Sequence, residues 1–158
     1  MYQDSELKFV ALLNRATPLP QRLNALGHMT AGLVSMARDG VLERMTFLDY
    51  ITRDGSVAAA ISKWPYIVLS AKNSEQIRRF KREALTHVAA GRLLYNDFLA
   101  SMLGASAEHQ LSATAASVEC QTEMFGAVAF GPADVLNLLT RRYSLFKLEH
   151  AGQSIASE

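Results

Sequence analysis

Three polar side chains are spaced so that one face of a helix would present them together. Gln21, Asn24 and His28 are three and four residues apart, and residues at that spacing are neighbours on a helix surface. An imidazole beside two amides can orient a carbonyl group or carry a proton. If the helix packs on a sheet, these side chains border the crevice near the carboxyl end of the first strand, where open α/β sheets tend to bind ligands. The structural alternative is that His28 bonds a backbone carbonyl and the two amides fix loops.

Asp97 is the carboxylate that could join this group. It could orient His28 or activate a water molecule. It could also cap the turn or short helix expected over residues 97–103, because aspartate accepts a hydrogen bond from a free N–H of the first helical turn. The two roles are not exclusive.

A second group of residues is basic. Arg78, Arg79 and Arg82 lie on one predicted helix, with Arg78 and Arg82 one turn apart on its polar face. They are the best candidate in the chain for a phosphate or nucleic-acid patch. Glu75 and Glu83 partly neutralise the group, and a charge run of this kind is also typical of a solvated helix face.

Motifs for cofactors and metals are absent from the sequence. It has no P-loop, no G-x-G-x-x-G, no G-x-S-x-G and no pair of His, Cys, Asp or Glu at a spacing typical of metal sites. We therefore expect no cofactor and no metal. The single cysteine, Cys120, cannot form an internal disulfide, which favours a reducing compartment and predicts a cytoplasmic protein. Neither a signal peptide nor a membrane-spanning run is expected, and no membrane partner.

The composition is that of one globular domain. The chain has 158 residues, of which 49% are hydrophobic and 20% charged, with a formal net charge of +1. These values exclude a disordered or fibrous chain and give no overall attraction to nucleic acid or an anionic membrane. We expect a single domain over residues 1–150 and a frayed tail over residues 151–158.

The elements that must position these residues alternate between strand and helix. Buried apolar runs predict strands, Pro20 and Pro132 suit first helical turns, and Asp54-Gly55 is a hairpin signal. The expected strands are 8–13, 44–52, 56–61, 66–71, 93–95 and 124–130, and the expected helices are 20–38, 74–90, 107–117 and 132–142. This alternation predicts an α/β domain with a largely buried mixed sheet.

Several short motifs occur in a recognisable order. A lysine opens the first strand, a histidine followed by small residues lies inside the first helix, and the last strand is followed by Gly-Pro-Ala. These segments are Lys8–Leu13, His28–Gly32, Gly131–Ala133 and Phe146–Leu148. In this order the chain resembles the type II peptidyl-tRNA hydrolases. It is similar more closely to an uncharacterised family of unknown function with the same fold, through Leu23-Asn24 four residues before the histidine and the stretch Tyr95–Phe98.

The resemblance implies a mixed, mostly four-stranded sheet with helices on both faces, and a homodimer. It adds Tyr95 and Asn96 to Gln21 and Asn24 as ligand-binding candidates, with His28 and Asp97 as catalytic candidates. The lysine thought to be catalytic in the hydrolases is replaced here by Gln21. Glutamine has no positive charge and no transferable proton, which argues against the hydrolase reaction.

Three functions follow as hypotheses. The first is a domain that binds a small molecule or a peptide-like group in the crevice. The second is a hydrolase acting on peptidyl-tRNA or a related ester, with tRNA held by the basic helix. The third is a protein–protein interaction module.

Overall fold

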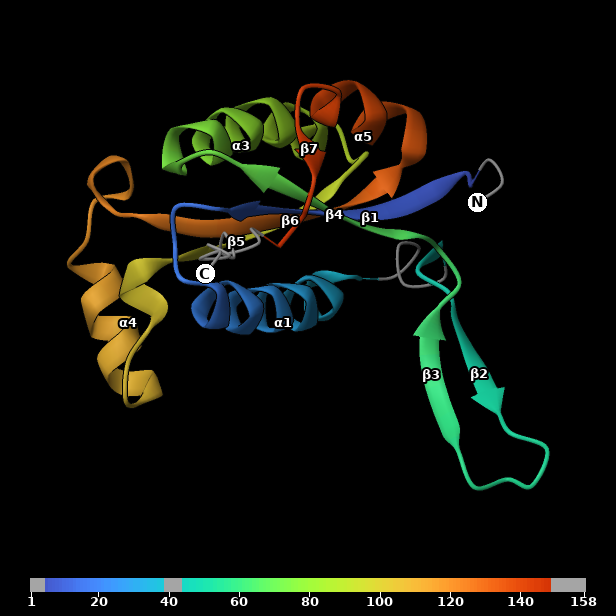
Figure 1. Ribbon diagram of the computed structural model, residues 1–158. Helices are drawn as coiled ribbons and strands as arrows, with labels where there is room; N and C mark the ends of the chain where they lie inside the picture. The colour runs from blue at the N-terminus through green and yellow to red at the C-terminus, as the bar shows by residue number, and fades with distance from the viewer. Residues whose placement is uncertain (1–4, 39–43, 149–158) are drawn as a thin grey trace, which may run out of the picture.

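One mixed sheet lies between two layers of helices in the computed structural model, which describes residues 5–38 and 44–148 (Figure 1). The sheet order is β5-β6-β1-β4-β7, in which β1 runs parallel to β4 and the other neighbours are antiparallel. The strands are β1 (Leu7–Asn14), β4 (Tyr66–Ala71), β5 (Leu94–Leu99), β6 (Met124–Pro132) and β7 (Ser144–Leu145). β1 is central, and this position explains why its sequence is apolar on both faces.

The helices divide the core into two parts. Helix α1 (Leu19–Met36) covers one face of the sheet, and α3 (Ser74–Ala89) and α5 (Ala133–Thr140) cover the other (Figure 1). Because alternate strand residues point to opposite faces, β1 supplies both halves. Phe9 and Leu13 pack with Met29 of α1, whereas Val10 and Leu12 belong to the cluster that contains the buried side chains of α3.

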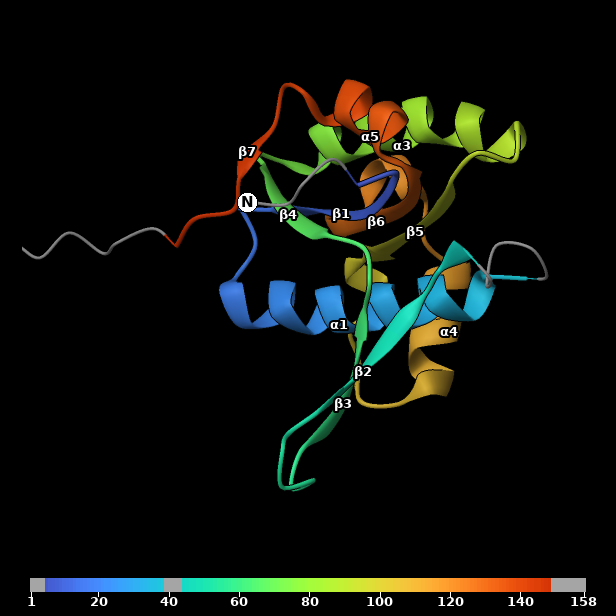
Figure 2. The ribbon, with the colours of Figure 1, turned by 90° about the vertical axis from the view of Figure 1, so that its right-hand side faces the viewer.

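A two-stranded hairpin stands apart from this sheet. β2 (Phe47–Ile51) pairs antiparallel with β3 (Ala58–Ser62), and the pair projects away from the domain (Figures 1 and 2). Gly55 has φ +72° in the connecting turn, a conformation that glycine adopts without strain. The Asp54 carboxylate accepts hydrogen bonds from Thr52 and Ser56, which lower its pKa to about 2. The predicted hairpin is confirmed.

The mixed α/β class is confirmed, and the sheet differs from expectation at its edges. The fifth strand, β7, has two residues and was not predicted, because so short a segment has no periodicity of its own. The N-cap of α3 is Asn73, whose Oδ1 accepts from the N–H of Gln76 at 3.0 Å. The Gln76 side chain accepts from the N–H of Lys72, and not of Asn73 as a capping box requires.

The prediction for the segment around Asp97 was wrong. Asp97 lies inside β5, paired with Ala127 of β6, and the short helix η1 (Ala100–Met102) that follows has Leu99 at its N-cap. Asp97 therefore caps no helix. Pairing with the buried strand β6 extends β5 through a segment whose polar residues suggested a turn. The expected tail, residues 151–158, falls outside the described residues.

Candidate functional site

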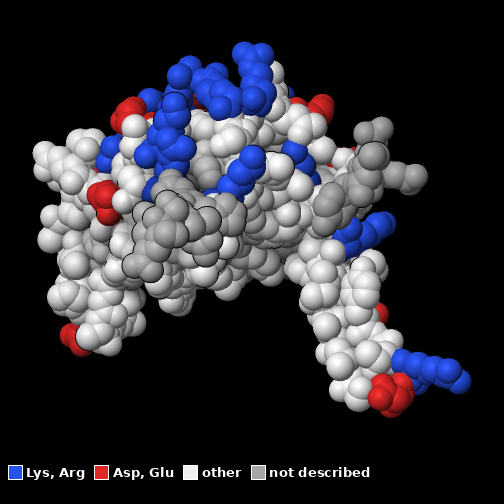
Figure 3. All heavy atoms as spheres, viewed as in Figure 1, with Lys and Arg blue, Asp and Glu red and all other residues white. Residues whose placement is uncertain are grey.

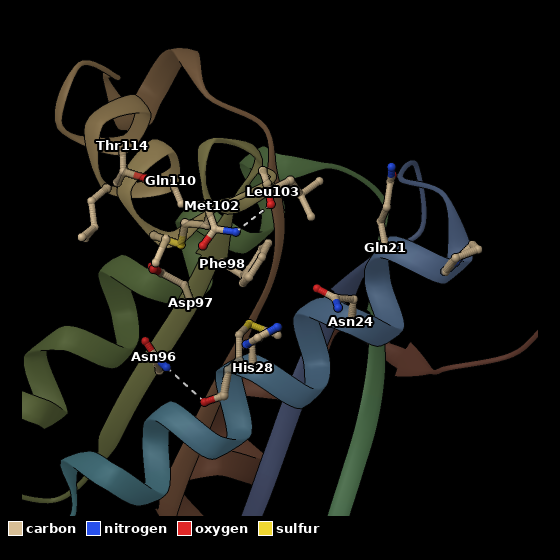
Figure 4. A pocket seen from close by; sticks show the side chains of 15 residues that line it. Gln21, Asn24, His28, Asn96, Asp97, Phe98, Met102, Leu103, Gln110 and Thr114 are labelled. Atoms are coloured by element: carbon tan, nitrogen blue, oxygen red, sulfur yellow. Dashed lines mark hydrogen bonds between the residues drawn. The ribbon is translucent and has the colours of Figure 1, made fainter.

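A cavity of about 840 Å³ opens between the first half of α1, the end of β5, and the segment formed by η1 and α4 (Ala107–Ala115) (Figure 4). Amides, an imidazole, a hydroxyl and, at the rim, one carboxylate provide its polar lining, and apolar side chains provide the rest. The polar side chains are those of Gln21, Asn24, His28, Asn96, Asp97, Gln110 and Thr114; the apolar ones include Phe98, Met102, Leu103 and Leu111.

Helix α1 brings the three residues of the predicted stripe to this cavity. Ala25, Met29 and Leu33 are fully buried against the sheet, so the positions beside them on the helix border the space between α1 and β5. Asn24 and His28 project toward the gap that Phe98 and Met102 close from the other side, and Gln21 lies at the entrance (Figure 4).

The imidazole of His28 is exposed in this cavity. Its ring centre lies 6.1 Å from that of Phe98, with the planes tilted by 30°. Within the described residues no hydrogen bond involves the imidazole, so the structural role considered for it, bonding a backbone carbonyl, is not seen. The ring nitrogens are therefore available to a ligand as donor or acceptor.

Strand β5 divides its polar residues between the two faces of the sheet. Asn96 points toward α1 and donates from Nδ2 to the Met29 carbonyl at 3.0 Å. This contact depends on Gly32, because a Cβ at that position would lie 2.6 Å from the Asn96 Nδ2 atom. Asn96 thus joins the edge strand to α1 and fixes one wall of the cavity.

Tyr95 and Asp97 point toward α3 instead. The Asp97 carboxylate accepts from Lys81 Nζ at 2.9 Å and from the Tyr95 hydroxyl at 3.1 Å. Lys81 also contacts Glu119 at 2.6 Å. Asp97 reaches the rim of the cavity, but among the described residues its carboxylate bonds Lys81 and Tyr95 and not His28. The structure therefore does not bring Asp97 and His28 together as a hydrogen-bonded pair, and Tyr95 does not line the cavity.

The titration of this cluster follows from its surroundings. Burial, and then the neighbouring Asp97 charge, raise the pKa of Tyr95 well above its ordinary value. Burial by itself lowers the pKa of Lys81, but hydrogen bonds and charges from Glu119 and Asp97 outweigh it, so that the pKa is raised. Lys81 is a cation at neutral pH, and the Asp97 charge is compensated from within the protein.

The far wall of the cavity was not predicted. Gln110 donates from Nε2 to the Gly104 carbonyl at 3.1 Å, and Thr114 donates to Ser101 Oγ at 3.0 Å. These bonds hold α4 against η1, beside Met102. A helix was predicted over residues 107–117, but no residue of α4 is buried. Without an apolar stripe, nothing indicated which face of α4 would meet the cavity.

The arginines of α3 lie away from this site. Arg78 donates to the carbonyls of Thr122 at 2.6 Å and Glu119 at 3.2 Å, and thereby holds the loop before β6. Arg79 pairs with Glu83 and Arg82 with Glu75. Lysine and arginine side chains gather over α3 and α5 (Figure 3), whereas none of those in residues 5–38 and 44–148 lines the cavity. In the described part of the chain, no cluster of His, Cys, Asp and Glu could hold a metal ion.

Comparison with known proteins identifies the family. Residues 7–147 match a family described as protein of unknown function, DUF2000. The chain belongs to this family. The match covers β1 through the segment after β7 and includes every residue of the cavity.

A solved structure of a protein of unknown function from Agrobacterium tumefaciens strain C58 has a similar fold. It superimposes with a TM-score of 0.74 at 14% sequence identity, over 91% of this chain and 100% of the other. At that identity the likeness concerns the fold alone. No curated protein matches the chain. No helix within the described ranges is long and apolar enough to cross a membrane.

Proposed function

We propose that this chain is a binding domain for a small, uncharged, peptide-like ligand, held in the cavity between α1, β5 and α4. The observation that carries the proposal is the chemistry of the lining. Four side-chain amides and one imidazole supply both donors and acceptors, the groups that pair with a peptide unit. The facing apolar side chains suit a side chain of the ligand.

The charges around the cavity support an uncharged ligand. In the part of the chain that the structure describes, no lysine or arginine lines it, and the carboxylate at its rim, Asp97, is compensated by Lys81. A phosphate or carboxylate ligand would lose its hydration without gaining a cation. A cationic ligand would have to compete with Lys81 for Asp97.

The binding experiment uses capped dipeptides that differ in side chain and charge. Binding is followed by the shift of thermal unfolding and then by calorimetry. A ligand at 100 times its Kd should stabilise the protein by about 2.7 kcal/mol. His28→Ala and Asn24→Ala should each raise Kd by about tenfold, equivalent to about 1.4 kcal/mol.

Ser35→Ala is the matched control. Ser35 is exposed on the same helix, and among the described residues its hydroxyl bonds the Gly32 carbonyl of its own helix, so this variant should bind as the wild type does. Equal affinity in all variants, or no stabilisation by any capped dipeptide, would contradict the proposal.

A hydrolase of peptidyl-tRNA or a related ester is the second candidate. The observation that favours it is the exposed His28 imidazole, which is free to act as a base on a bound ester. Gln21 at the entrance supplies no cation for the developing negative charge. Turnover of peptidyl-tRNA by the wild type that His28→Ala abolishes would establish this function in place of simple binding.

We propose further that the fold is of the type II peptidyl-tRNA hydrolase kind and that the protein is cytoplasmic. The order of motifs around the first helix, and a mixed sheet with α1 on one face and α3 and α5 on the other, support the fold. The exposed, unpaired Cys120 supports a reducing compartment.

A further inference from the structure

We infer that the hairpin of β2 and β3 is a dimerisation arm, through which two copies of this chain associate by the arm's uncharged face. The arm comprises residues 47–62. It extends about 17 Å, since each strand has five residues that rise about 3.4 Å apiece. Within the described residues, its two strands pair only with each other.

The side chains of the arm are far more exposed than its composition predicts. All five residues of β2 are exposed, although four of them are apolar or aromatic. A hairpin of two strands with both faces in water is marginally stable at best. Burial of these exposed apolar side chains against a partner surface would therefore be favourable in free energy.

The two faces of the arm differ in charge. The register pairs Leu48 with Ile61 and Tyr50 with Ala59, so these residues share one face, and alternation along β3 adds Val57 to it. Within the arm, residues 47–62, this face has no charged residue, and Lys63 follows it at the base. The opposite face carries Asp49 between Phe47 and Ile51, and a carboxylate there would be costly to bury. The uncharged face is therefore the one that a partner covers.

A groove at the base of the arm is lined by residues from both of its faces. The groove holds about 440 Å³ and lies between the arm and α1. Tyr50 and Ile61 line it from the uncharged face, Phe47 and Ser62 line it from the opposite face, and Lys63 lies at its edge. Trp64 and Tyr66 line it further in. A second arm laid along the first would place its own apolar residues over this groove, and the first arm would do the same in return.

The size of the patch fits a second copy. Leu48, Tyr50, Val57 and Ile61 are 41% to 54% exposed, which amounts to roughly 400 Å² of largely apolar surface per chain on typical side-chain areas. With the groove, the patch approaches the roughly 600–800 Å² per partner of a reversible dimer. A two-fold axis lets one self-complementary patch serve both chains. The net charge of +1 per chain opposes the contact little.

The charge pattern of the arm agrees with this arrangement. Its charged side chains lie mainly at the tip, which is the turn between the two strands. The shaft, which consists of the strands β2 and β3, is largely uncharged (Figure 3). The tip carries Arg53 and Asp54 side by side. Opposite charges at the tip keep the exposed end in water while the shaft is covered.

The test is the mass of the full chain in solution by sedimentation and light scattering, between about 1 and 100 μM, the range that a weak interface of this size requires. We expect a reversible transition between 17.4 kDa and twice that mass. Tyr50→Asp and Ile61→Asp each place a charge in both halves of the interface. Each should raise the dimer Kd by roughly 100-fold or more.

Ile51→Asp is the matched control. Ile51 is 67% exposed, next to Tyr50 in the sequence, and on the opposite face; this variant should still form the dimer. Circular dichroism of each variant verifies the fold, which does not depend on these exposed side chains. A wild type that stays at 17.4 kDa throughout, or a dimer unaffected by Tyr50→Asp and Ile61→Asp, would overturn the inference. Loss of the dimer in Ile51→Asp alone would also overturn it.

Discussion

Replacing Tyr95 with phenylalanine should make the protein less sensitive to alkaline unfolding. The Tyr95 hydroxyl donates to the Asp97 carboxylate and is buried beside Lys81. Burial, and then the Asp97 charge, raise the pKa of Tyr95 well above its ordinary value of 10.0. The folded protein therefore keeps this proton at pH 11, whereas the unfolded chain loses it.

The sign and size of the change in unfolding free energy with pH follow from the linkage between proton binding and folding. A tyrosine with a raised folded pKa contributes stability that is fully present below the unfolded pKa and is lost as pH rises above it. With an unfolded pKa of 10.0, the loss from this one group at pH 11 is about 1.4 kcal/mol. Below pH 9, Tyr95→Phe should cost about 1 kcal/mol through the missing hydrogen bond. The difference in unfolding free energy between wild type and variant should therefore fall to zero, or change sign slightly, by pH 11.

The assay is urea unfolding of both proteins at pH 9 and pH 11 with matched salt and protein concentration. Thr17→Val is the control, since it removes a buried hydrogen bond to the Asn14 carbonyl and no titrating group. Its gap from wild type should be the same at both pH values. The raised pKa of Lys81 acts in the same direction, above pH 10.5, in both wild type and variant. A constant gap for Tyr95→Phe across this range would refute the reasoning.

Two further predictions concern a close backbone contact in the sheet and the hydrogen bonds that hold a loop. Gly126→Ala should destabilise the fold by about 1–2 kcal/mol in chemical denaturation, because its Cβ would lie 2.9 Å from the Leu12 carbonyl oxygen, which the sheet holds in place. Arg78→Met should cost about 1–3 kcal/mol, since it leaves two loop carbonyls without their donor. Arg79→Met and Arg82→Met, which break only exposed ion pairs, should each cost under about 0.5 kcal/mol; equal losses in all three would contradict the loop-holding role of Arg78.

The sequence by itself determined the alternation of elements and the stripe on α1. Buried strands such as Leu7–Asn14 are continuous apolar runs, and Asn73 marks the start of α3 with its own side chain. The positions of Gln21, Asn24 and His28 beside the buried face of α1 follow from the helical repeat alone. These features depend on residues that are close together in the sequence, and they can therefore be predicted without knowledge of the fold.

Only the tertiary structure decided what faces that stripe. Whether Asp97 would meet His28 depended on β5 extending through it, and that extension comes from pairing with β6, where Ala127, the partner of Asp97, is 30 positions further along the chain. Strand alternation then sent Asn96 toward α1 and Asp97 toward Lys81. The wall formed by α4, and the exposure of the arm, likewise depend on contacts between distant segments. Because a one-residue change in strand extent or register exchanges the two faces of a strand, no pattern within a single segment could have settled which side chains share the cavity.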